Sequence, residues 1–444
     1  VRDEAAQAAV VAFLARPEHF GGTPPRVVET HISRVFVGKE RALKLKRARA
    51  LPFLDATDPA RRRALAETEV AINRRTAPAI YRGVLAVVDR GGALALVPEG
   101  AAGEGGRVLD HVVEMAAFDP EAELDRVLAR GELDDRLVDR AADRIADMHR
   151  VSPVATVRDG GARVARTVEQ VGRDLAGMAP AAPHRGSIAA WRAFAEETLA
   201  RIGPLLDRRG RHGFVRRCHG DLHLGNICLW EGEPTPFDAI EFDDEMATID
   251  VLYDLAFLIA DLCYRSADGK AIRLLDRYLE TTRDYAGLAA MPLFTSLRAM
   301  VRGLVTAARG QDPAGWIALA LRLGRPAGPA RLVAVGGRSG TGKSTLARAL
   351  AGPLGAVTMR TDGIRKRLFG VTPETRLPSE AYDEAVSARV YRRMRSDARR
   401  ALGAGVPVIL DGTFLSPSER ASVEAIASGV GVPFAGIWLT AGED

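Results

Sequence analysis

Cysteine and lysine are both scarce in this sequence of 444 residues. The three cysteines, Cys218, Cys228 and Cys263, are odd in number and lack the spacing of a metal site, which argues against a disulfide framework. Free thiols are typical of a reducing compartment, so we expect a cytoplasmic protein. Only six lysines occur; two of them, Lys44 and Lys46, alternate along one expected strand, and Lys343 follows a run of glycines.

Long apolar runs and charge clusters are missing as well. No stretch of 18 or more apolar residues is free of charge, so we expect no membrane partner. The pI is about 9.3 but the net charge is only +5. The arginines are scattered, without a basic run or interleaved aromatic residues, and we do not expect nucleic acid as a partner. The oligomeric state is not predicted.

The length predicts two or three domains. Residues 34–37 and 42–46 alternate as strands do, residues 61–75 have the pattern of a helix, and helical patterns dominate from residue 121. Residues 227–230 and 236–242 again have strand character. The Pro/Gly-rich segment 324–330 predicts a linker, after which a strand, a glycine loop and a helix begin an α/β unit.

The glycine loop has the pattern G-x-x-x-x-G-K-S between an apolar strand and a helix. Backbone N–H groups of such a loop surround phosphate oxygens, so the pattern predicts an ATP site. We expect Lys343 to neutralise the β- and γ-phosphates and the Ser344 hydroxyl to bind Mg²⁺. The expected ATP-binding residues of this loop are Gly337, Arg338, Ser339, Gly340, Thr341, Gly342, Lys343, Ser344 and Thr345.

Two later segments place polar residues just beyond strand ends, where parallel sheets bind ligands. Asp362 is a candidate base for a substrate hydroxyl, or else a helix N-cap. Arg365, one turn further, is a candidate for holding an anionic substrate group. Asp411 is a candidate carboxylate at the Mg²⁺ site, or else a turn residue before Gly412.

The segments "RTDGIRKRL" and "VILDGTFLSPSER", together with the glycine loop, resemble P-loop kinases of small molecules and nucleic acids, such as gluconate kinases, zeta-type toxins and phage polynucleotide kinases. The resemblance covers roughly residues 331 to 440. Such kinases continue with an arginine-bearing lid after the strand at 435–439, so we expect this domain to be incomplete and the sequence to be a fragment.

A second constellation lies in "CHGDLHLGN", which has the arrangement H-x-D-x-x-x-x-N. Asp221 can orient and deprotonate a substrate hydroxyl beside His219, and Asn226 can reach a metal ion at the γ-phosphate. A zinc site of His219, Asp221 and His223 is the alternative, although a fourth ligand at fitting spacing is lacking.

The acid that would complete this metal site is either Asp238 or Glu241. Asp238 follows Asn226 at the distance expected for the far side of a hairpin. On a strand through 236–242 the two acids would face opposite sides, so both would reach one metal ion only across a bend.

Lys44 fits the strand lysine that binds the α- and β-phosphates, and Glu69 in the next helix fits its carboxylate partner. Lys46 on the same strand face is the alternative. Glu114 and Met115, between the strand-rich and helix-rich regions, are candidates for the hinge whose backbone meets adenine.

With these motifs, residues of roughly 30 to 320 resemble the aminoglycoside phosphotransferase (choline kinase-like) family, which also carries a segment similar to "IDVLYDLAFL". The family commonly has Ile-Asp-aromatic where this chain has Ile240-Glu241-Phe242. The order of domains resembles bacterial fusions of this family with an ATP-binding domain. The resemblance implies an α+β protein-kinase-like bilobal fold followed by an α/β P-loop NTPase domain with a mostly parallel sheet. The expected parts are a kinase-like N-lobe (1–113), a helical C-lobe (114–323), a linker (324–330) and a P-loop domain (331–444).

The first hypothesis is therefore a bifunctional ATP- and Mg²⁺-dependent kinase that phosphorylates hydroxyl groups of small molecules. A regulatory protein with one ATP-binding but non-catalytic domain is the second hypothesis. A nucleic-acid end kinase acting through the P-loop domain is the third. The acceptor itself is not predicted, because acceptor pockets carry no motif.

Overall fold

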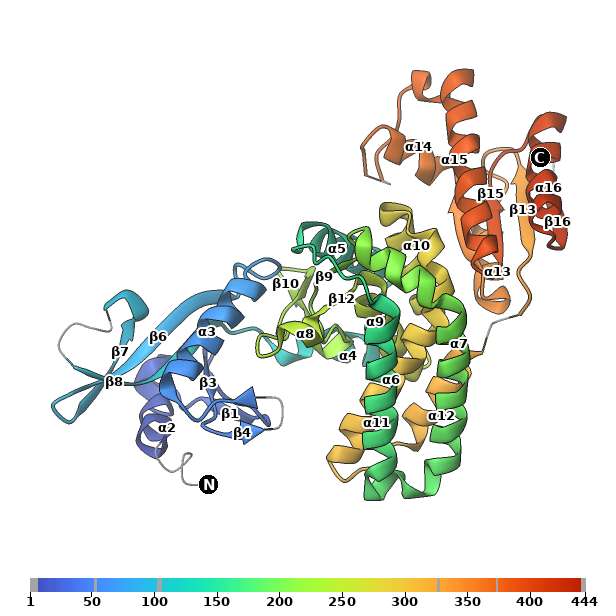
Figure 1. Cartoon of the computed structure of the whole chain (residues 1–444). Helices are drawn as coiled ribbons and strands as arrows, with labels where there is room; N and C mark the ends of the chain where they lie inside the picture. Colours follow the sequence, from blue (N-terminus) through green and yellow to red (C-terminus); the bar gives the residue numbers. More distant parts are fainter. Residues whose placement is uncertain (1–6, 52–53, 102–105, 326–327, 373, 441–444) are drawn as a thin grey trace. The chain divides into compact units, whose positions relative to one another are not determined.

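The computed structural model describes residues 7–51, 54–101, 106–325, 328–372 and 374–440. These residues form two compact units (Figure 1). The first unit comprises Val1–Asp134, Val151–Pro153 and Arg216–Ile249, and the second comprises Asp135–Arg150, Val154–Val215 and Asp250–Asp444. Of the expected linker, residues 326 and 327 lie outside the described residues, as do residues 441–444 at the end of the expected P-loop domain.

The first unit is built on an antiparallel six-stranded sheet with the order β1-β2-β3-β8-β6-β7. Its strands are β1 (Arg26–Glu29), β2 (Ser33–Val37), β3 (Arg41–Lys46), β6 (Tyr81–Arg90), β7 (Ala93–Pro98) and β8 (Arg107–Ala116). The strands predicted at 34–37 and 42–46 are confirmed as β2 and β3. Because β3 lies between β2 and β8, its side chains are almost all buried.

Helix α3 (Pro59–Asn73) precedes β6 in the chain and packs on this sheet. Asp58 accepts a hydrogen bond from the Ala60 N–H, and Pro59 opens the helix, a combination that favours a helix start. The remaining elements of the unit are α2 (Ala8–Leu14), η1 (Pro17–Phe20), β4 (Ala50–Leu51), β5 (Leu54–Asp55), η2 (Glu99–Ala101), η3 (Pro120–Ala122), α4 (Leu124–Ala129), η5 (Leu224–Asn226), β10 (Ile227–Trp230), β11 (Glu233–Pro236) and α8 (Asp244–Ala247).

The second unit begins with a helical region. Its helices are α5 (Asp135–Val151), α6 (Gly160–Gly177), η4 (Ala179–His184), α7 (Arg185–Arg211), α9 (Val251–Tyr264), α10 (Asp268–Thr282), η6 (Tyr285–Ala290), α11 (Met291–Ala308) and α12 (Ala314–Gly324). The helix pairs α6–α7 and α11–α12 pack along their lengths (Figure 1). The chain passes between the units after Asp134, on both sides of Val151–Pro153, in β9 (Val215–Arg217) and in β12 (Thr248–Asp250).

The second unit ends in an α/β region with a parallel four-stranded sheet of order β14-β15-β13-β16. Its elements are β13 (Leu332–Gly337), α13 (Lys343–Leu354), β14 (Val357–Arg360), α14 (Thr361–Leu368), η7 (Ser379–Tyr382), α15 (Glu384–Gly403), β15 (Val408–Asp411), α16 (Pro417–Val430) and β16 (Phe434–Leu439). An α+β region followed by a parallel α/β region confirms the predicted fold class.

Among the described residues, the stretch Tyr285–Ala308 is long and apolar enough to cross a membrane by composition alone. It is 67% buried inside the structure, as core helices are. It spans η6 and α11, and Arg298 and Arg302 fall within it. One helix of this kind is weak evidence for a membrane span, and the expected absence of a membrane partner stays a prediction.

Helix α10 is joined to the edge strand β14 of the parallel sheet. The Thr358 N–H donates a hydrogen bond to the Asp276 carboxylate over 3.0 Å, and Arg283 pairs with Asp397 of α15 over 2.6 Å. Burial raises the pKa of Asp276 to about 8. The hydrogen bonds from Thr358 and the charge of Arg273 act in the opposite direction, whereas Glu280 adds to the increase.

This pKa predicts a stability that depends on pH. The folded chain keeps a proton on Asp276 that the unfolded chain releases near pH 4, so stability falls as the pH rises from about 4 to about 8. Replacing Asp276→Asn keeps an oxygen acceptor for Thr358 and removes the titration. At pH 8 the variant is expected to be more stable than the wild type by about 1–3 kcal/mol. Melting curves of the variant and the wild type at pH 5 and pH 8 check this. A stability difference between the two proteins that is the same at both pH values would contradict it.

Candidate active sites

The first candidate site is centred on Lys44 of β3. The Lys44 Nζ atom lies 2.7 Å from Glu69 Oε1 on α3 and 2.5 Å from Asp238 Oδ1. Burial lowers the pKa of Lys44, but the charges of Asp238 and Glu69 outweigh burial and hold it well above its ordinary value. Burial likewise opposes ionisation of Asp238, yet Lys44 keeps the pKa of this carboxyl below its usual range. All three groups are therefore charged at neutral pH.

Lys46 lies on the same strand face but points into the interior. Its Nζ atom is 2.5 Å from Glu69 Oε2 and is paired with Glu241, while only 1% of its side chain is exposed. The Asp238 side chain, in contrast, is 43% exposed. The two lysines share Glu69, and Lys44 is the one on the open side, next to Asp238.

Replacing Lys46→Met is expected to destabilise the first unit strongly. It removes the lysine that pairs with the buried Glu241 and leaves Glu69 with Lys44 alone, and breaking a buried ion pair in this way costs about 3–5 kcal/mol. Thermal melting of the full chain should show a midpoint for this unit lowered by roughly 5 °C or more. Lys39→Met, at an exposed position of the β2–β3 turn, is the matched control, and an equal midpoint for both variants would contradict this account.

The segment that carries Asp238 and Glu241 is not a strand, and the predicted strand over 236–242 is wrong. Strand β11 ends at Pro236, and Asp238 has a φ of 60°, a left-handed conformation that ends the pleat. The Asp238 N–H donates to Tyr81 Oη over 3.1 Å, and the Ala239 N–H donates to Asn73 Oδ1 over 2.9 Å. This bend explains how Asp238 reaches Lys44 while Glu241 reaches Lys46.

Sequence reasoning missed Tyr81 and Asn73, the two residues that hold this bend. Both are fully buried, and the Asn73 amide also donates to the Glu69 carbonyl oxygen over 2.9 Å. Neither belongs to a motif. The one available signal is an asparagine in the last turn of a helix, which also occurs in helices without function.

The loop around Asp221 is held from two sides. The His219 Nε2–H donates to the Phe237 carbonyl oxygen over 2.9 Å, and His219 Nδ1 accepts from the Asp221 N–H over 3.3 Å. Asn226 Nδ2 donates to the Asp221 backbone oxygen over 2.9 Å and to its Oδ2 over 3.0 Å. The Asp221 side chain remains 40% exposed, and its charge is near enough to Asp238 to oppose, without reversing, the lowering of that residue's pKa by Lys44.

These bonds correct two expectations about His219. Both of its ring nitrogens bind backbone groups and the residue is 1% exposed, so it positions the loop and does not reach a substrate as a catalytic group. For the same reason it has no nitrogen to offer a zinc ion beside His223, and the zinc alternative is wrong. Gly220 next to it has a φ of 86°, and a Cβ atom there would lie 3.0 Å from Ile240.

The expected hinge at Glu114 and Met115 also needs correction. Both residues lie within β8, between β3 on one side and β6 on the other, and the Glu114 carboxylate pairs with Arg41 over 2.9 Å. Their backbone is part of the sheet, which continues to Ala116. Backbone that leaves the sheet, and so could meet an adenine ring, begins only after Ala116.

The second candidate site is the glycine loop between β13 and α13. Gly337, Gly340 and Gly342 have φ values of 138°, 86° and 85°, which L side chains rarely adopt. At Gly337 a Cβ atom would lie 2.4 Å from the Leu439 carbonyl oxygen. The loop therefore curls ahead of α13 as predicted, with Thr341 Oγ1 and Lys343 Nζ both donating to the Arg338 carbonyl oxygen. Thr345 lies in the first turn of α13.

Ser344 and Asp411 meet at the carboxyl ends of β13 and β15. The Ser344 hydroxyl donates to Asp411 Oδ2 over 2.5 Å, and Arg360 Nε lies 3.6 Å from the same oxygen. Val335, Arg360 and Asp411 occupy neighbouring registers of three parallel strands. This is the edge of a parallel sheet at which ligands bind.

The structure separates the two residues of the expected acceptor site. Asp362 lies in the first turn of α14, not at its N-cap, and its side chain is 42% exposed and paired with Lys366 over 3.0 Å. Arg365 is only 7% exposed and donates to the Ala381 carbonyl oxygen and to Ser387 Oγ. Its guanidinium stacks over Tyr382, so Arg365 holds the segment before α15 and does not reach a substrate, which corrects the prediction.

A kinase-type phosphotransferase is the class of protein that this fold and these sites define. Residues 73–291 match the model of the Phosphotransferase enzyme family, and residues 332–444 match that of an AAA domain. The chain thus combines a domain of the phosphotransferase enzyme family with a P-loop kinase-type domain, which confirms the resemblance drawn from the motifs.

Uncharacterized proteins of Mycobacterium bovis and Mycobacterium tuberculosis are 29% identical to this chain over 418 residues, which is 90% of this chain and 81% of theirs. A solved choline/ethanolamine kinase family protein from Mesorhizobium loti is similar at 14% identity with a TM-score of 0.41, over 72% of this chain and 94% of that one. An ADP-bound aminoglycoside phosphotransferase is similar at 12% identity with a TM-score of 0.37, over 72% and 97% of the two chains.

Proposed function

We propose that the first unit is an ATP- and Mg²⁺-dependent phosphotransferase that acts on a hydroxyl group of a small molecule in the cytoplasm. The observation that carries the proposal is the contact of Lys44 with both Glu69 and Asp238. The buried Glu69 holds Lys44 in position for neutralising phosphate charge. The half-exposed Asp238 lies beside Lys44, where a carboxylate is needed to bind the metal ion.

Under this proposal, a part of the first unit is assigned to each part of the nucleotide. Lys44 would bind the α- and β-phosphates from the open side of Glu69. Ala42 and Met115 belong to an apolar cluster that includes Phe118 and Phe237, whose rings meet edge to face with centroids 5.0 Å apart. This cluster would cover the adenine ring, and the backbone beyond Ala116 would bind its edge.

The residues present fit a magnesium ion. Mg²⁺ prefers oxygen ligands, and Asp238 supplies a carboxylate that Lys44 keeps ionised. Because Asn226 Nδ2 is bonded to Asp221, Oδ1 is the Asn226 atom that remains for a metal ion. Burial raises the pKa of Glu241 despite Lys46, and this residue is 7% exposed, so Asp238 is the better ligand. When bound, the ion would neutralise charge on the β- and γ-phosphates.

Asp221 would act on the acceptor. Its exposed carboxylate takes the proton of the substrate hydroxyl as that oxygen bonds to the γ-phosphorus and the bond to the β-phosphate oxygen breaks. Asn226 holds the Asp221 carboxylate and His219 holds its backbone, which limits how far the base can turn. The products are the phosphorylated acceptor and ADP.

The P-loop domain would hold a second ATP. Lys343 would bind the β- and γ-phosphates, Ser344 and Asp411 would hold Mg²⁺, and Asp362 would be the acceptor base. We propose functional boundaries at 1–113, 114–323 and 331–444. The linker at 324–330 fits the end of α12 at Gly324 and the start of β13 at Leu332.

A screen of small hydroxyl compounds as phosphate acceptors, with full-length protein and Mg-ATP, tests this function. ADP release that depends on an acceptor is expected, and it should be lost at one site with Asp221→Asn and at the other with Lys343→Ala. Tight ATP binding without any acceptor-dependent turnover would favour the regulatory hypothesis. Labelling of 5′-hydroxyl oligonucleotides in a salt-sensitive manner would favour the nucleic-acid end kinase.

A further inference from the structure

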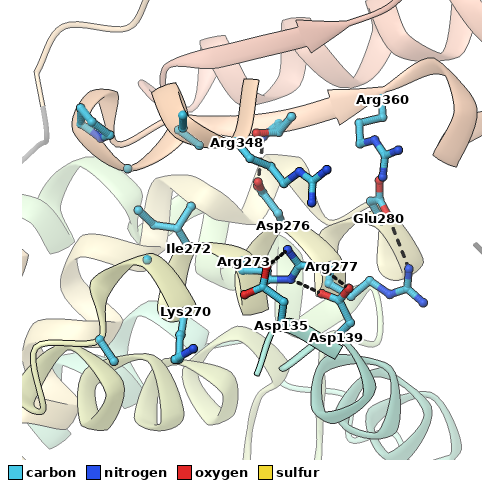
Figure 2. A pocket seen from close by; sticks show the side chains of 17 residues that line it. Asp135, Asp139, Lys270, Ile272, Arg273, Asp276, Arg277, Glu280, Arg348 and Arg360 are labelled. Carbon is cyan, nitrogen blue, oxygen red and sulfur yellow. Dashed lines mark hydrogen bonds and ion pairs between the residues drawn. The ribbon is translucent and has the colours of Figure 1, made fainter. Parts of the chain in front are cut away.

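A cavity of about 580 Å³ lies in the second unit, and its lining includes no residue of the glycine loop or of the catalytic loop (Figure 2). One side is formed by α10 and the start of α5, and the other by α13 and β14. Its volume is that of a site for a small molecule. In Figure 2 the side chains of Arg348 and Arg360 approach it from the α/β region, and those of Asp276 and Glu280 from α10.

Part of the charge around the cavity is neutralised within its wall. Arg273 binds Asp139 with two hydrogen bonds of 2.6 and 2.7 Å and pairs with Asp135 over 2.6 Å. Arg277 binds Asp143 in the same bidentate way over 2.5 and 2.8 Å. These fork-like pairs fix α10 against α5. The charges of Arg277 and Asp143 cancel, whereas Arg273 with its two aspartates leaves one negative charge on the cavity wall.

The remaining charges are mostly positive. Lys270, Arg348 and Arg360 line the cavity with positive charge, and Glu280 lines it with a negative charge. Asp276 carries a proton at neutral pH, because burial raises its pKa to about 8. Lys270, Arg348 and Arg360 therefore face Glu280 and the one unbalanced aspartate beside Arg273. An anionic ligand would balance the positive charge that remains.

Arg348 and Arg360 are each held in position by a contact with a residue of the second candidate site. Arg348 Nε donates to the Ser344 carbonyl oxygen over 3.0 Å, and Arg360 Nε lies 3.6 Å from Asp411 Oδ2. Each contact uses the Nε edge of a guanidinium group, which leaves the terminal nitrogens to bind a ligand. Guanidinium groups match phosphate oxygens in shape and charge.

We propose that this cavity binds a small phosphomonoester dianion through Lys270, Arg348 and Arg360. The neutral Asp276 and the carboxylate of Glu280 provide hydrogen-bonding groups for hydroxyls on the same ligand. The proposal does not depend on phosphate transfer at either nucleotide site. Since Arg348 and Arg360 also contact the residues around Ser344 and Asp411, the ligand is expected to change nucleotide affinity at the glycine loop, and nucleotide to change ligand affinity equally.

Calorimetric titration of glycerol 3-phosphate tests the proposal. The full-length chain is first saturated with Mg²⁺ and a non-hydrolysable ATP analogue, so that the glycine loop cannot take up the probe. Saturable binding of one molecule per chain is expected, weakened at least 10-fold in Lys270→Ala and in Arg348→Ala. Arg399→Ala, an exposed arginine of α15, is the matched control and should bind as the wild type does. Glycerol at the same concentration should not bind.

A second measurement keeps the proposal open to refutation if a variant folds poorly. Acetylation of the six lysines of the wild-type chain can be followed by mass spectrometry, and the probe should slow the reaction at Lys270 but not at Lys39. Absence of saturable binding would overturn the proposal. Equal affinity in Lys270→Ala and Arg348→Ala, or unchanged acetylation of Lys270, would overturn it as well.

Discussion

Acceptor-dependent phosphate transfer by the first site is expected to fall by about 10²–10⁴-fold when Asp221 is replaced by Asn, the loss typical of removing a positioned general base. The amide has nearly the shape of the carboxylate but cannot take the proton of the attacking hydroxyl. Because the Asp221 backbone oxygen still accepts from Asn226, the loop should keep its conformation, and ATP affinity should change little. Initial rates of ADP release with an acceptor found in the screen measure the effect.

This experiment is best done in a Lys343→Ala background, so that the P-loop domain adds no turnover. Asp244→Asn is the matched control, since Asp244 is in the same unit, is paired with Arg217 and has a side chain that is 86% exposed. The control should retain full activity. An Asp221→Asn variant that transfers phosphate at the wild-type rate would remove Asp221 from the mechanism.

Nucleotide binding at the P-loop domain is expected to weaken by roughly 10–100-fold when Lys343 is replaced by Ala, which corresponds to the loss of a hydrogen bond to a charged group. The lysine opens α13 and folds back over the glycine loop to the Arg338 carbonyl oxygen, where the terminal phosphates would lie. The first site contains none of these residues, so its affinity should be unchanged. Titration with a fluorescent ATP analogue resolves the two affinities.

Arg392→Ala is a suitable comparison for Lys343→Ala, because Arg392 is exposed on α15 of the same region. This variant also loses one positive charge, but it should bind nucleotide as the wild type does. A general effect of charge would weaken both variants equally, and such a result would contradict a specific role of Lys343.

The sequence predicted best those groups whose chemistry is tied to a local motif. The glycine loop, Asp221 with Asn226, and the pairing of Lys44 with Glu69 all depend on short spacings or on one strand and the following helix. The choice between Lys44 and Lys46 was not available from the pattern. Both lie on one strand face and both contact Glu69, and they differ in that Lys44 pairs with Asp238 whereas Lys46 pairs with Glu241.

The errors arose where long-range contacts decide the conformation. Asp238 leaves the strand path because Tyr81 and Asn73, far away in the sequence, hold the backbone of the bend. Glu114 and Met115 stay in the sheet because β3 and β6 flank them on both sides. Arg365 has a spacing from Asp362 that suits an anion site, but the segment before α15 returns to cover it. No local pattern encodes these contacts.

The number of nucleotides bound per chain tests the central claim most directly. Equilibrium binding of a non-hydrolysable ATP analogue with Mg²⁺ to the full-length chain should reach two per chain. At analogue concentrations that saturate only the first site, Lys343→Ala should bind one. A wild-type chain that binds a single nucleotide at saturation would contradict the account of two separate phosphate-binding sites.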